Sequence, residues 1–466
     1  MERENRRLKS MSETTKRCQV EMHDGKSCGR ELYDGKCCIF HSEKKDKDVE
    51  LFQNRLDQIF KDESVKIYDF TRFIFPEGIV FLRKFSKPVI CEHAIFKGKA
   101  QFENAVFEDR ADFVGVTFEG DADFLYALFK GKADFVVTCF KGRAIFAYAV
   151  FEGEADFGIT TFEVGVHFMN ASFNRQTNFA GASIKGEGYF LNATFQEMVS
   201  FCSAAFGDFI MITAEEHHKK AFRQEVDFRN VKLLKPEKVE FHKVDLNRFR
   251  FLQTDLRGVR FTDVDWYKEK EKGRNKVFDE VSPDPKTKKF DYALIAQLCR
   301  CLRANYEENL RYSEAGDFYI GEMEMTRKAE KNIFKKLPLL FYKAISNYGE
   351  SYYRTLWWIA VILLIFPLLF MFTGIEPISL DSTNPMEEII HYRLDFSSIE
   401  SVQLTIEKIG DYYTCFLYSM SVFSFIRDKK YTTLDNWGHT LFVLESILGP
   451  VTLAFFLLAL RRRFKR

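Results

Sequence analysis

Three cysteines and one histidine near the N-terminus are the residues best suited to bind a metal ion. They are spaced as Cys18-x9-Cys28-x9-Cys38-x2-His41. Thiolates and imidazole are preferred ligands of zinc, and four of them complete a tetrahedral structural site. Because four protein ligands leave no open coordination position, we expect a structural zinc ion there and no catalysis.

The segment around these residues has the features of a small metal-dependent unit. Gly25 and Gly35 can provide the turns that precede the second and third ligands. A segment this short cannot bury a core of its own, so bound metal would supply its folding energy. His23 and Cys37 are competing donors, and reduced thiols without any metal are the alternative. We assign residues 1–48 to this zinc-binding-like segment.

Glu445 is a second candidate for chemistry, because it is the only charged residue in the apolar run Trp437–Leu460. An ionisable group in a membrane segment suggests a functional role, and its alternative here is a helix–helix hydrogen bond. The sequence has no Walker-type phosphate loop, no Gly-x-Ser-x-Gly, no metalloprotease motif and no dinucleotide fingerprint. We therefore expect a protein that is not an enzyme.

Two apolar runs near the C-terminus predict membrane spans. Leu356–Gly374 contains no charge, and as a helix it would be about 28 Å long, close to the hydrocarbon thickness of a bilayer. Its Pro367 is tolerated in membrane helices. We expect a two-span α-helical membrane domain over residues 347–466, with spans at about 356–374 and 437–460.

The distribution of basic residues predicts the orientation of these spans in the cell membrane. Five of the six residues at 461–466 are basic, whereas 375–388 contains acidic residues and no basic one. Before the first span come Lys335, Lys336, Lys343 and Arg354. Lysine and arginine mark the cytoplasmic side, so we expect both termini in the cytoplasm. Three basic residues within 427–430 argue against this orientation.

The stretch between the spans favours a pore-like module. Tyr412–Ile426 is short for a span and long enough for a re-entrant helix. The order of span, re-entrant helix and span resembles the pore domain of two-span potassium channels. However, Ser421–Asp428 has no glycine for a carbonyl filter, so potassium selectivity is not expected. Our pore and gating candidates are Ser424, Arg427, Glu445, Gly449 and Pro450.

The chain that must carry these sites is dominated by phenylalanine, with 51 residues in 466. From 96 to 206, Phe recurs in steps of six and five, interrupted at Ile184, which gives a period of eleven. In an α-helix a five-residue step turns about 140°, so alternate rings would point to nearly opposite faces. In a β-solenoid each ring and the residue two positions before it point inward. Two eleven-residue units would then form one four-sided coil.

This pattern, in which a small residue precedes Phe by two positions, resembles the pentapeptide-repeat family. The regular five-residue form returns at 241–266. The resemblance implies a right-handed quadrilateral β-helix. Cys38–His41 and the Lys/Asp-rich stretch after it are similar to membrane-linked members of the family. We assign 49–79 to a short helix leading into the solenoid, 80–266 to the solenoid, 267–289 to a charged linker and 290–346 to a helical hairpin connector.

Composition and organisation together limit the expected function. With 68 basic and 67 acidic residues, the formal net charge is +1, and no nucleic-acid partner is expected. We expect a cytoplasmic sensor or scaffold solenoid, with a possible protein partner on its surface, fused to a pore-like module. A homo-oligomer is expected, a tetramer if a pore forms. The alternatives are a membrane-anchored scaffold without conduction and a DNA-mimic-type pentapeptide protein.

Overall fold

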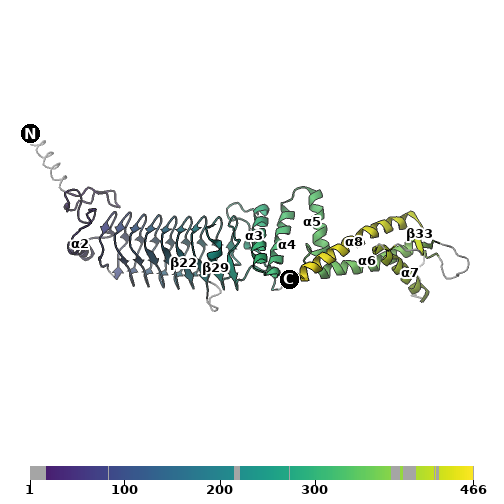
Figure 1. The fold of residues 1–466 in the computed structure, drawn as a ribbon. Helices are drawn as coiled ribbons and strands as arrows, with labels where there is room; N and C mark the ends of the chain where they lie inside the picture. The colour runs from purple at the N-terminus through teal and green to yellow at the C-terminus, as the bar shows by residue number, and fades with distance from the viewer. Residues whose placement is uncertain are drawn as a thin grey trace, which may run out of the picture. The chain divides into compact units, whose positions relative to one another are not determined.

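The computed structural model describes residues 17–81, 83–214, 221–271, 273–378, 389–391, 406–424, 426 and 430–464. The chain divides into two compact units, Met1–Glu322 and Met323–Arg466. The first unit contains the stacked strands of a solenoid, and the second consists mainly of helices (Figure 1).

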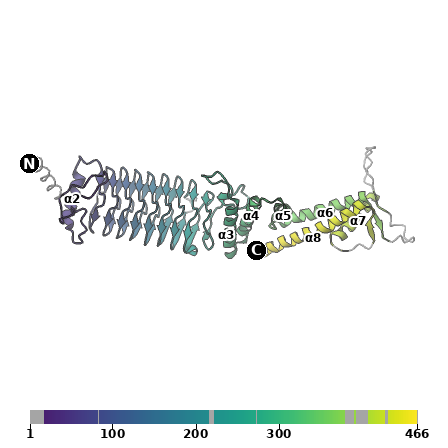
Figure 2. The same cartoon turned by 90° about the horizontal axis from the view of Figure 1, so that it is seen from above.

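The described strands of the first unit form four parallel sheets, stacked coil upon coil (Figures 1 and 2). The first sheet contains β1 (Tyr68–Asp69), β4 (Val89–Ile90), β8 (Ala111–Asp112), β12 (Ala133–Asp134), β16 (Ala155–Asp156), β20 (Thr177–Asn178), β24 (Val199–Ser200), β27 (Val226–Asp227) and β30 (Phe249–Arg250). The second contains β6 (Ala100–Gln101), β10 (Ala122–Asp123), β14 (Arg143–Ile145), β18 (Gly165–His167), β22 (Glu187–Leu191), β26 (Ile210–Thr213), β29 (Val239–His242) and β31 (Arg260–Thr262). The third contains β3 (Lys84–Phe85), β7 (Val106–Phe107), β11 (Leu128–Phe129), β15 (Val150–Phe151), β19 (Ser172–Phe173) and β23 (Thr194–Phe195). The fourth contains β2 (Ile74–Phe75), β5 (Ile95–Phe96), β9 (Thr117–Phe118), β13 (Cys139–Phe140), β17 (Thr161–Phe162), β21 (Ser183–Ile184), β25 (Ala205–Phe206) and β28 (Lys232–Leu233).

Strand register confirms the predicted coil of two eleven-residue units. Ala122 pairs with Ala144, which lies one coil further along the chain. The rings of Phe124 and Phe146 stack with centroids 4.8 Å apart and an interplanar angle of 2°. Phe124 also meets Phe135, from the opposite side of the coil, edge-on at 85°. The core is therefore a set of stacked aromatic columns, and the sequence period of eleven is the spacing between opposite sides of one coil.

Glycine at the corners allows neighbouring coils to approach. A Cβ atom on Gly153 would lie 2.3 Å from the carbonyl oxygen of Gly131, in the preceding coil. A side chain at this position would force the coils apart. The glycine of sequences such as Lys130-Gly131-Lys132 therefore marks a close contact between the backbones of two coils.

Helices follow the solenoid and precede it. Helix α2 (Val49–Lys61) begins at Asp48, whose carboxylate accepts a hydrogen bond from the Leu51 amide. After the last coils come the 3-10 turn η3 (Phe278–Glu280), α3 (Tyr292–Glu308) and α4 (Tyr312–Ala329). A further 3-10 turn, η2 (Pro236–Lys238), lies between two strands of the solenoid.

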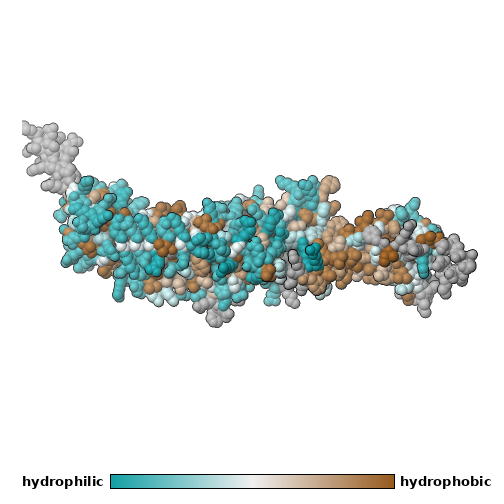
Figure 3. Space-filling model, in the orientation of Figure 1, coloured by the Kyte–Doolittle hydropathy of each residue, from teal (hydrophilic) through white to brown (hydrophobic). Residues whose placement is uncertain are grey.

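Among its described residues, the second unit contains two helices that are long and apolar enough to cross a membrane, over Tyr352–Thr373 and Asn436–Arg462. They belong to α6 (Tyr352–Thr373) and α8 (Asn436–Phe464), which run side by side in Figures 1 and 2. The other elements are α5 (Ile333–Ser346), β32 (Ile375–Pro377), α7 (Ile406–Phe423) and β33 (Tyr431–Thr433). The visible surface over α6 and α8 is largely hydrophobic, whereas that of the solenoid is mainly hydrophilic (Figure 3).

Both ends of the α6–α8 pair are joined by polar contacts. At one end the Arg462 guanidinium donates a hydrogen bond to the Tyr348 carbonyl at 3.0 Å and pairs with Glu350. At the other end β32 and β33 form a two-stranded antiparallel sheet. The residues that precede α6 and those that end α8 therefore lie together.

Candidate metal centre

Two antiparallel bridges bring the first two cysteines together. Arg17 pairs with Glu31 and Glu21 with Ser27. Inside this small hairpin, the Cys18 amide donates to the Arg30 carbonyl at 2.9 Å and the Cys28 amide to the Val20 carbonyl at 2.7 Å. Cys18 and Cys28 therefore lie on facing arms of the hairpin. Gly25 has φ +77°, a left-handed value that suits glycine at the tip.

A tight turn supplies the other two donors. The amides of His41 and Ser42 donate to the Cys38 carbonyl at 3.1 and 2.9 Å. The Asp34 carboxylate accepts hydrogen bonds from the Ser42 hydroxyl and the Cys37 amide, which holds this turn in place. The Ser42 hydrogen bond is the main reason that the pKa of Asp34 falls to about 2.

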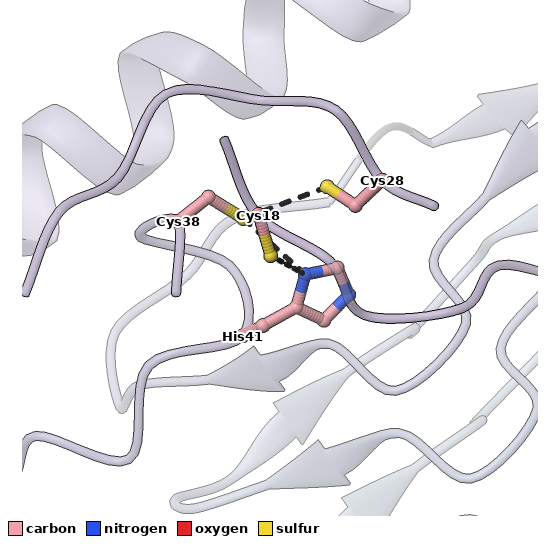
Figure 4. A group of neighbouring side chains, drawn as sticks. All are labelled: Cys18, Cys28, Cys38 and His41. Carbon is pink, nitrogen blue, oxygen red and sulfur yellow. Dashed lines mark hydrogen bonds between the residues drawn. The ribbon is translucent and has the colours of Figure 1, made fainter. Parts of the chain in front are cut away.

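The ligand atoms of Cys18, Cys28, Cys38 and His41 all lie within 4.8 Å of one another. Figure 4 shows the four side chains pointing toward one another. His41 Nδ1 is 3.4 Å from Cys18 Sγ and 3.3 Å from Cys38 Sγ, and the Cys28 and Cys38 sulfurs are 3.7 Å apart. Zinc–sulfur and zinc–nitrogen bond lengths place tetrahedral ligands about 3.8 Å apart for two sulfurs and about 3.6 Å for sulfur and nitrogen. The donor set therefore fits a tetrahedral metal ion.

A hydrogen bond outside the cluster determines which histidine nitrogen faces the metal position. His41 Nε2 lies 3.1 Å from the Thr71 carbonyl oxygen. A carbonyl only accepts, so Nε2 carries the proton and the Nδ1 lone pair points toward the three sulfurs. Thr71 thus completes the ligand geometry, although it lies 30 residues from His41.

The cluster also favours thiolate at one sulfur. The hydrogen bond from Cys38 lowers the pKa of the Cys28 thiol, while Cys28 and burial raise the pKa of Cys38. Arg30 Nη1 donates to Cys28 Sγ at 3.2 Å. A cation beside the sulfur stabilises the charge that a metal ligand must carry.

The two competing donors lie outside this group of four. Cys37 is not part of the cluster. His23 Nδ1 lies 3.0 Å from a carboxylate oxygen of Glu92, and its amide donates to Asp69. His23 thus links the tip of the hairpin to the first coils of the solenoid.

The residues around the cluster cover the N-terminal end of the solenoid. The Phe40 ring stacks on Phe73 with centroids 4.4 Å apart, and the Phe40 carbonyl accepts a hydrogen bond from the Ile74 amide. Lys47 Nζ donates to the Ile74 carbonyl at 2.7 Å, and burial lowers the pKa of Lys47 to about 8. Sequence reasoning gave no structural role to Phe40, Lys47 or Thr71, although Phe40 directly precedes His41 and Lys47 follows it by six residues.

Comparison with known proteins decides the identity of the solenoid. A family model described as pentapeptide repeats (9 copies) matches residues 92–138. The solenoid is a pentapeptide-repeat domain. An uncharacterized protein of Methanocaldococcus jannaschii is 30% identical over 155 residues, which cover 28% of this chain and 33% of that protein. The chain thus spans about a third of the length of this curated relative. No solved structure matches the chain.

Beyond the pentapeptide-repeat solenoid, the second unit contains most of the pore candidates. Glu445 is fully buried, and the Ser419 hydroxyl of α7 donates to its Oε1. Its Oε2 has no hydrogen-bond partner among the described residues. A Cβ on Gly449 would lie 2.8 Å from the Phe423 carbonyl oxygen, so this glycine allows α7 and α8 to approach closely.

The remaining pore candidates have separate positions. Pro450 lies inside α8, next to Gly449, and Ser424 directly follows α7. Arg427 lies outside the described residues. The structure therefore brings Glu445 and Gly449 to the contact between α7 and α8.

Proposed function

We propose that the Cys/His cluster is a structural zinc site that closes the N-terminal end of the pentapeptide-repeat solenoid. The observation that carries the proposal is the shared role of His41, which faces three sulfurs with Nδ1 and the Thr71 carbonyl of the first coil with Nε2. Bound zinc would hold the hairpin against Phe73 and Ile74. Four protein ligands suit this structural role.

Metal analysis of the purified full chain tests this site. We expect about one zinc ion per chain, as four ligands predict. Cys28→Ser removes one ligand and should leave the metal substoichiometric, whereas Cys37→Ser, the matched control in the same segment, should retain it. Equal zinc content in both variants would contradict the ligand set.

We propose that α6 and α8 span the cell membrane and that the protein has no enzymatic activity; the length and apolar composition of the two helices support the spans. The contact between Arg462 and Tyr348 supports the placement of both span ends on one side. The basic residues at 461–466 assign that side, together with both termini and the solenoid, to the cytoplasm.

Helix α7, which is 18 residues long, supports an oligomeric pore built from this two-span module. α7 lies against α6 and α8, and Tyr418 and Val422 of α7 share a buried core with Phe366 and Phe370 of α6. The observation that carries the pore function is Glu445, a fully buried carboxyl with one unpartnered oxygen where α7 meets α8. A two-span chain cannot surround a channel alone, so the pore is a homo-oligomer, and a tetramer by analogy with two-span channels.

Flux through liposomes containing the purified protein tests the pore. We expect an ion leak without potassium selectivity, because the stretch after α7 lacks the glycines of a carbonyl filter. Glu445→Gln should change the flux, while Glu376→Gln in β32 serves as the control. A correctly inserted chain that is monomeric and passes no ions would overturn the pore function.

A membrane-anchored scaffold is the second candidate, and the solenoid corners favour it. Tyr126 and Tyr148 are about half exposed and stack 4.9 Å apart. At the corners on the opposite side, Val137 and Ile159 are exposed and have φ values of +59° and +58°. Left-handed φ is costly for β-branched residues, and backbone strain often marks functional sites. Exposed apolar side chains at strained corners suit binding to a protein partner. The scaffold candidate predicts no flux in the liposome experiment.

A further inference from the structure

The helix α5, which precedes the first candidate span, has an exposed apolar face. Ile333, Phe334, Leu337, Leu340 and Phe341 are 61%, 82%, 51%, 37% and 55% exposed. Their spacing of one, four, seven and eight residues from Ile333 places them on one side of the helix. Apolar side chains in such a row are costly to leave in water, so this face is suited to a partner.

The C-terminal end of α5 is fixed beside the start of α6. Five residues separate Ser346, the last residue of α5, from Tyr352, the first of α6. Trp358 Nε1 donates to the Ala344 carbonyl at 3.2 Å, and Arg354 Nη1 donates to the Lys343 carbonyl at 3.3 Å. Because α6 is a candidate span, these contacts hold α5 at the level where that span leaves the bilayer.

The residues at this junction are those found at membrane surfaces. A shallow groove between α5 and α6 is lined by Ala344, Tyr353, Arg354, Trp357 and Trp358. Tyr353 and Trp357 are 70% and 59% exposed. Tryptophan and tyrosine concentrate at the boundary between lipid headgroups and acyl chains, and arginine binds phosphate there.

The charges of α5 favour an anionic surface. The helix contains Lys335, Lys336 and Lys343 and no acidic residue. Lys343 pairs with Glu324, whereas no ion pair involves Lys335 or Lys336 within the part of the chain that the structure describes. Lysines flanking an apolar face reach lipid phosphates while the face enters the acyl boundary.

We propose that α5 is an in-plane helix that lies on the cytoplasmic leaflet and binds anionic lipid. Its apolar face enters the boundary between headgroups and acyl chains, and Lys336, which flanks that face, contacts lipid phosphates. This placement rests on the proposed function, because it requires α6 to span the same bilayer.

Photo-crosslinking in the full chain tests the placement. The photoreactive residue p-benzoylphenylalanine replaces one residue at a time in protein reconstituted into vesicles of phosphatidylcholine and phosphatidylglycerol. The sites are Phe334 on the apolar face, Lys335 on the opposite face as the matched control, and Leu364, which is exposed in the middle of α6. We expect lipid adducts at 334 and 364 and far fewer at 335.

The three sites separate failure of this inference from failure of the proposed span. Lipid adducts at 364 without adducts at 334 would overturn the in-plane helix and leave the span intact. Adducts at neither position would overturn the span itself. A crosslink from 334 to a second copy of the chain would assign the apolar face to an oligomer interface and overturn the lipid partner.

Lys336 provides the test of lipid charge. Replacing Lys336 by Gln should lower the yield of phosphatidylglycerol adducts at 334 by about fivefold. The same position changed to Arg keeps the charge and should retain the yield. Equal yields for the Gln and Arg variants would overturn the anionic preference.

Discussion

At its N-terminal end the solenoid is covered by a segment with hardly any core of its own, whereas at its C-terminal end it is covered by helices. The N-terminal cover is formed by residues 17–48. The ligand atoms of its three cysteines and one histidine converge on one point, and Phe40 and His41 contact the first coil. The C-terminal cover, formed by α3 and α4, buries Trp266 against Tyr306 of α3 and Phe318 of α4, and the indole of Trp266 donates to the Tyr306 hydroxyl at 2.7 Å.

Both covers shield an end of the solenoid, because a terminal coil would otherwise expose strand edges and aromatic rings to water. If the proposed zinc is bound, one cover depends on an ion that can be removed, whereas the other depends on buried side chains that are always present. The two ends should therefore unfold separately and under different conditions. The predictions below separate them, from the largest expected effect to the smallest.

Removal of the metal should produce the largest effect, and only at the N-terminal end. Structural zinc contributes about 10 kcal/mol or more to the folding of small zinc-binding segments. After chelation, residues 17–48 should lose nearly all protection from hydrogen exchange, while α3 keeps its own. Unchanged protection at 17–48 in protein shown to be metal-free would mean that the two ends are closed by the same means.

The substitution Asn305→Ala should weaken only the C-terminal end. The buried Asn305 amide of α3 donates to the carbonyls of Leu256 and Val259 at 2.7 and 2.8 Å. Without it, two buried carbonyls lose their donor, which costs about 2–4 kcal/mol. Hydrogen exchange of residues 249–262 should rise, with residues 17–48 unaffected. Gln297→Ala, at an exposed position of the same helix, is the control and should change neither end.

The C-terminal end should also respond to pH through Asp279 of η3. Its carboxyl is 1% exposed, and burial raises its pKa from 3.8 to about 7. Asp279 Oδ2 accepts from the Phe251 amide, while Oδ1 has no hydrogen-bond partner in the described part of the chain. The charged groups that act on it are Arg250, Arg229 and Asp227.

The sign of this response follows from where the proton is bound. Between about pH 4 and pH 7 the folded protein keeps a proton on Asp279 that the unfolded chain releases. Rising pH therefore lowers the stability of this end by about 1.4 kcal/mol per pH unit, until the carboxyl ionises near pH 7. Hydrogen exchange at 277–282, corrected for its intrinsic pH dependence, should show the loss. Asp279→Asn should abolish it, and persistence of the loss in that variant would assign it to another group.

The same comparison shows what the sequence could predict. The aromatic columns were predictable because one pattern recurs every eleven residues and each ring meets the same environment. The metal-ligating candidates were selected from their types and spacing, and the structure brings the four together. The contacts that join the covers to the coils were not predictable, because they link residues as distant as Asn305 and Leu256. A single carbonyl or amide has no sequence pattern that reveals its partner.

The region between the two ends should respond least, and Val137 provides the test. Its left-handed φ of +59° costs a β-branched residue about 1 kcal/mol relative to asparagine, so Val137→Asn should stabilise its coil by that amount. Asn170, with φ +55° at an equivalent turn, allows the reverse change, and Asn170→Val should destabilise by a similar amount. Hydrogen exchange of the central coils should slow in Val137→Asn and speed up in Asn170→Val. Because fraying begins at the ends, neither variant should alter protection at 17–48 or at 249–262, and a change there would show that the coils and their covers unfold as one cooperative unit.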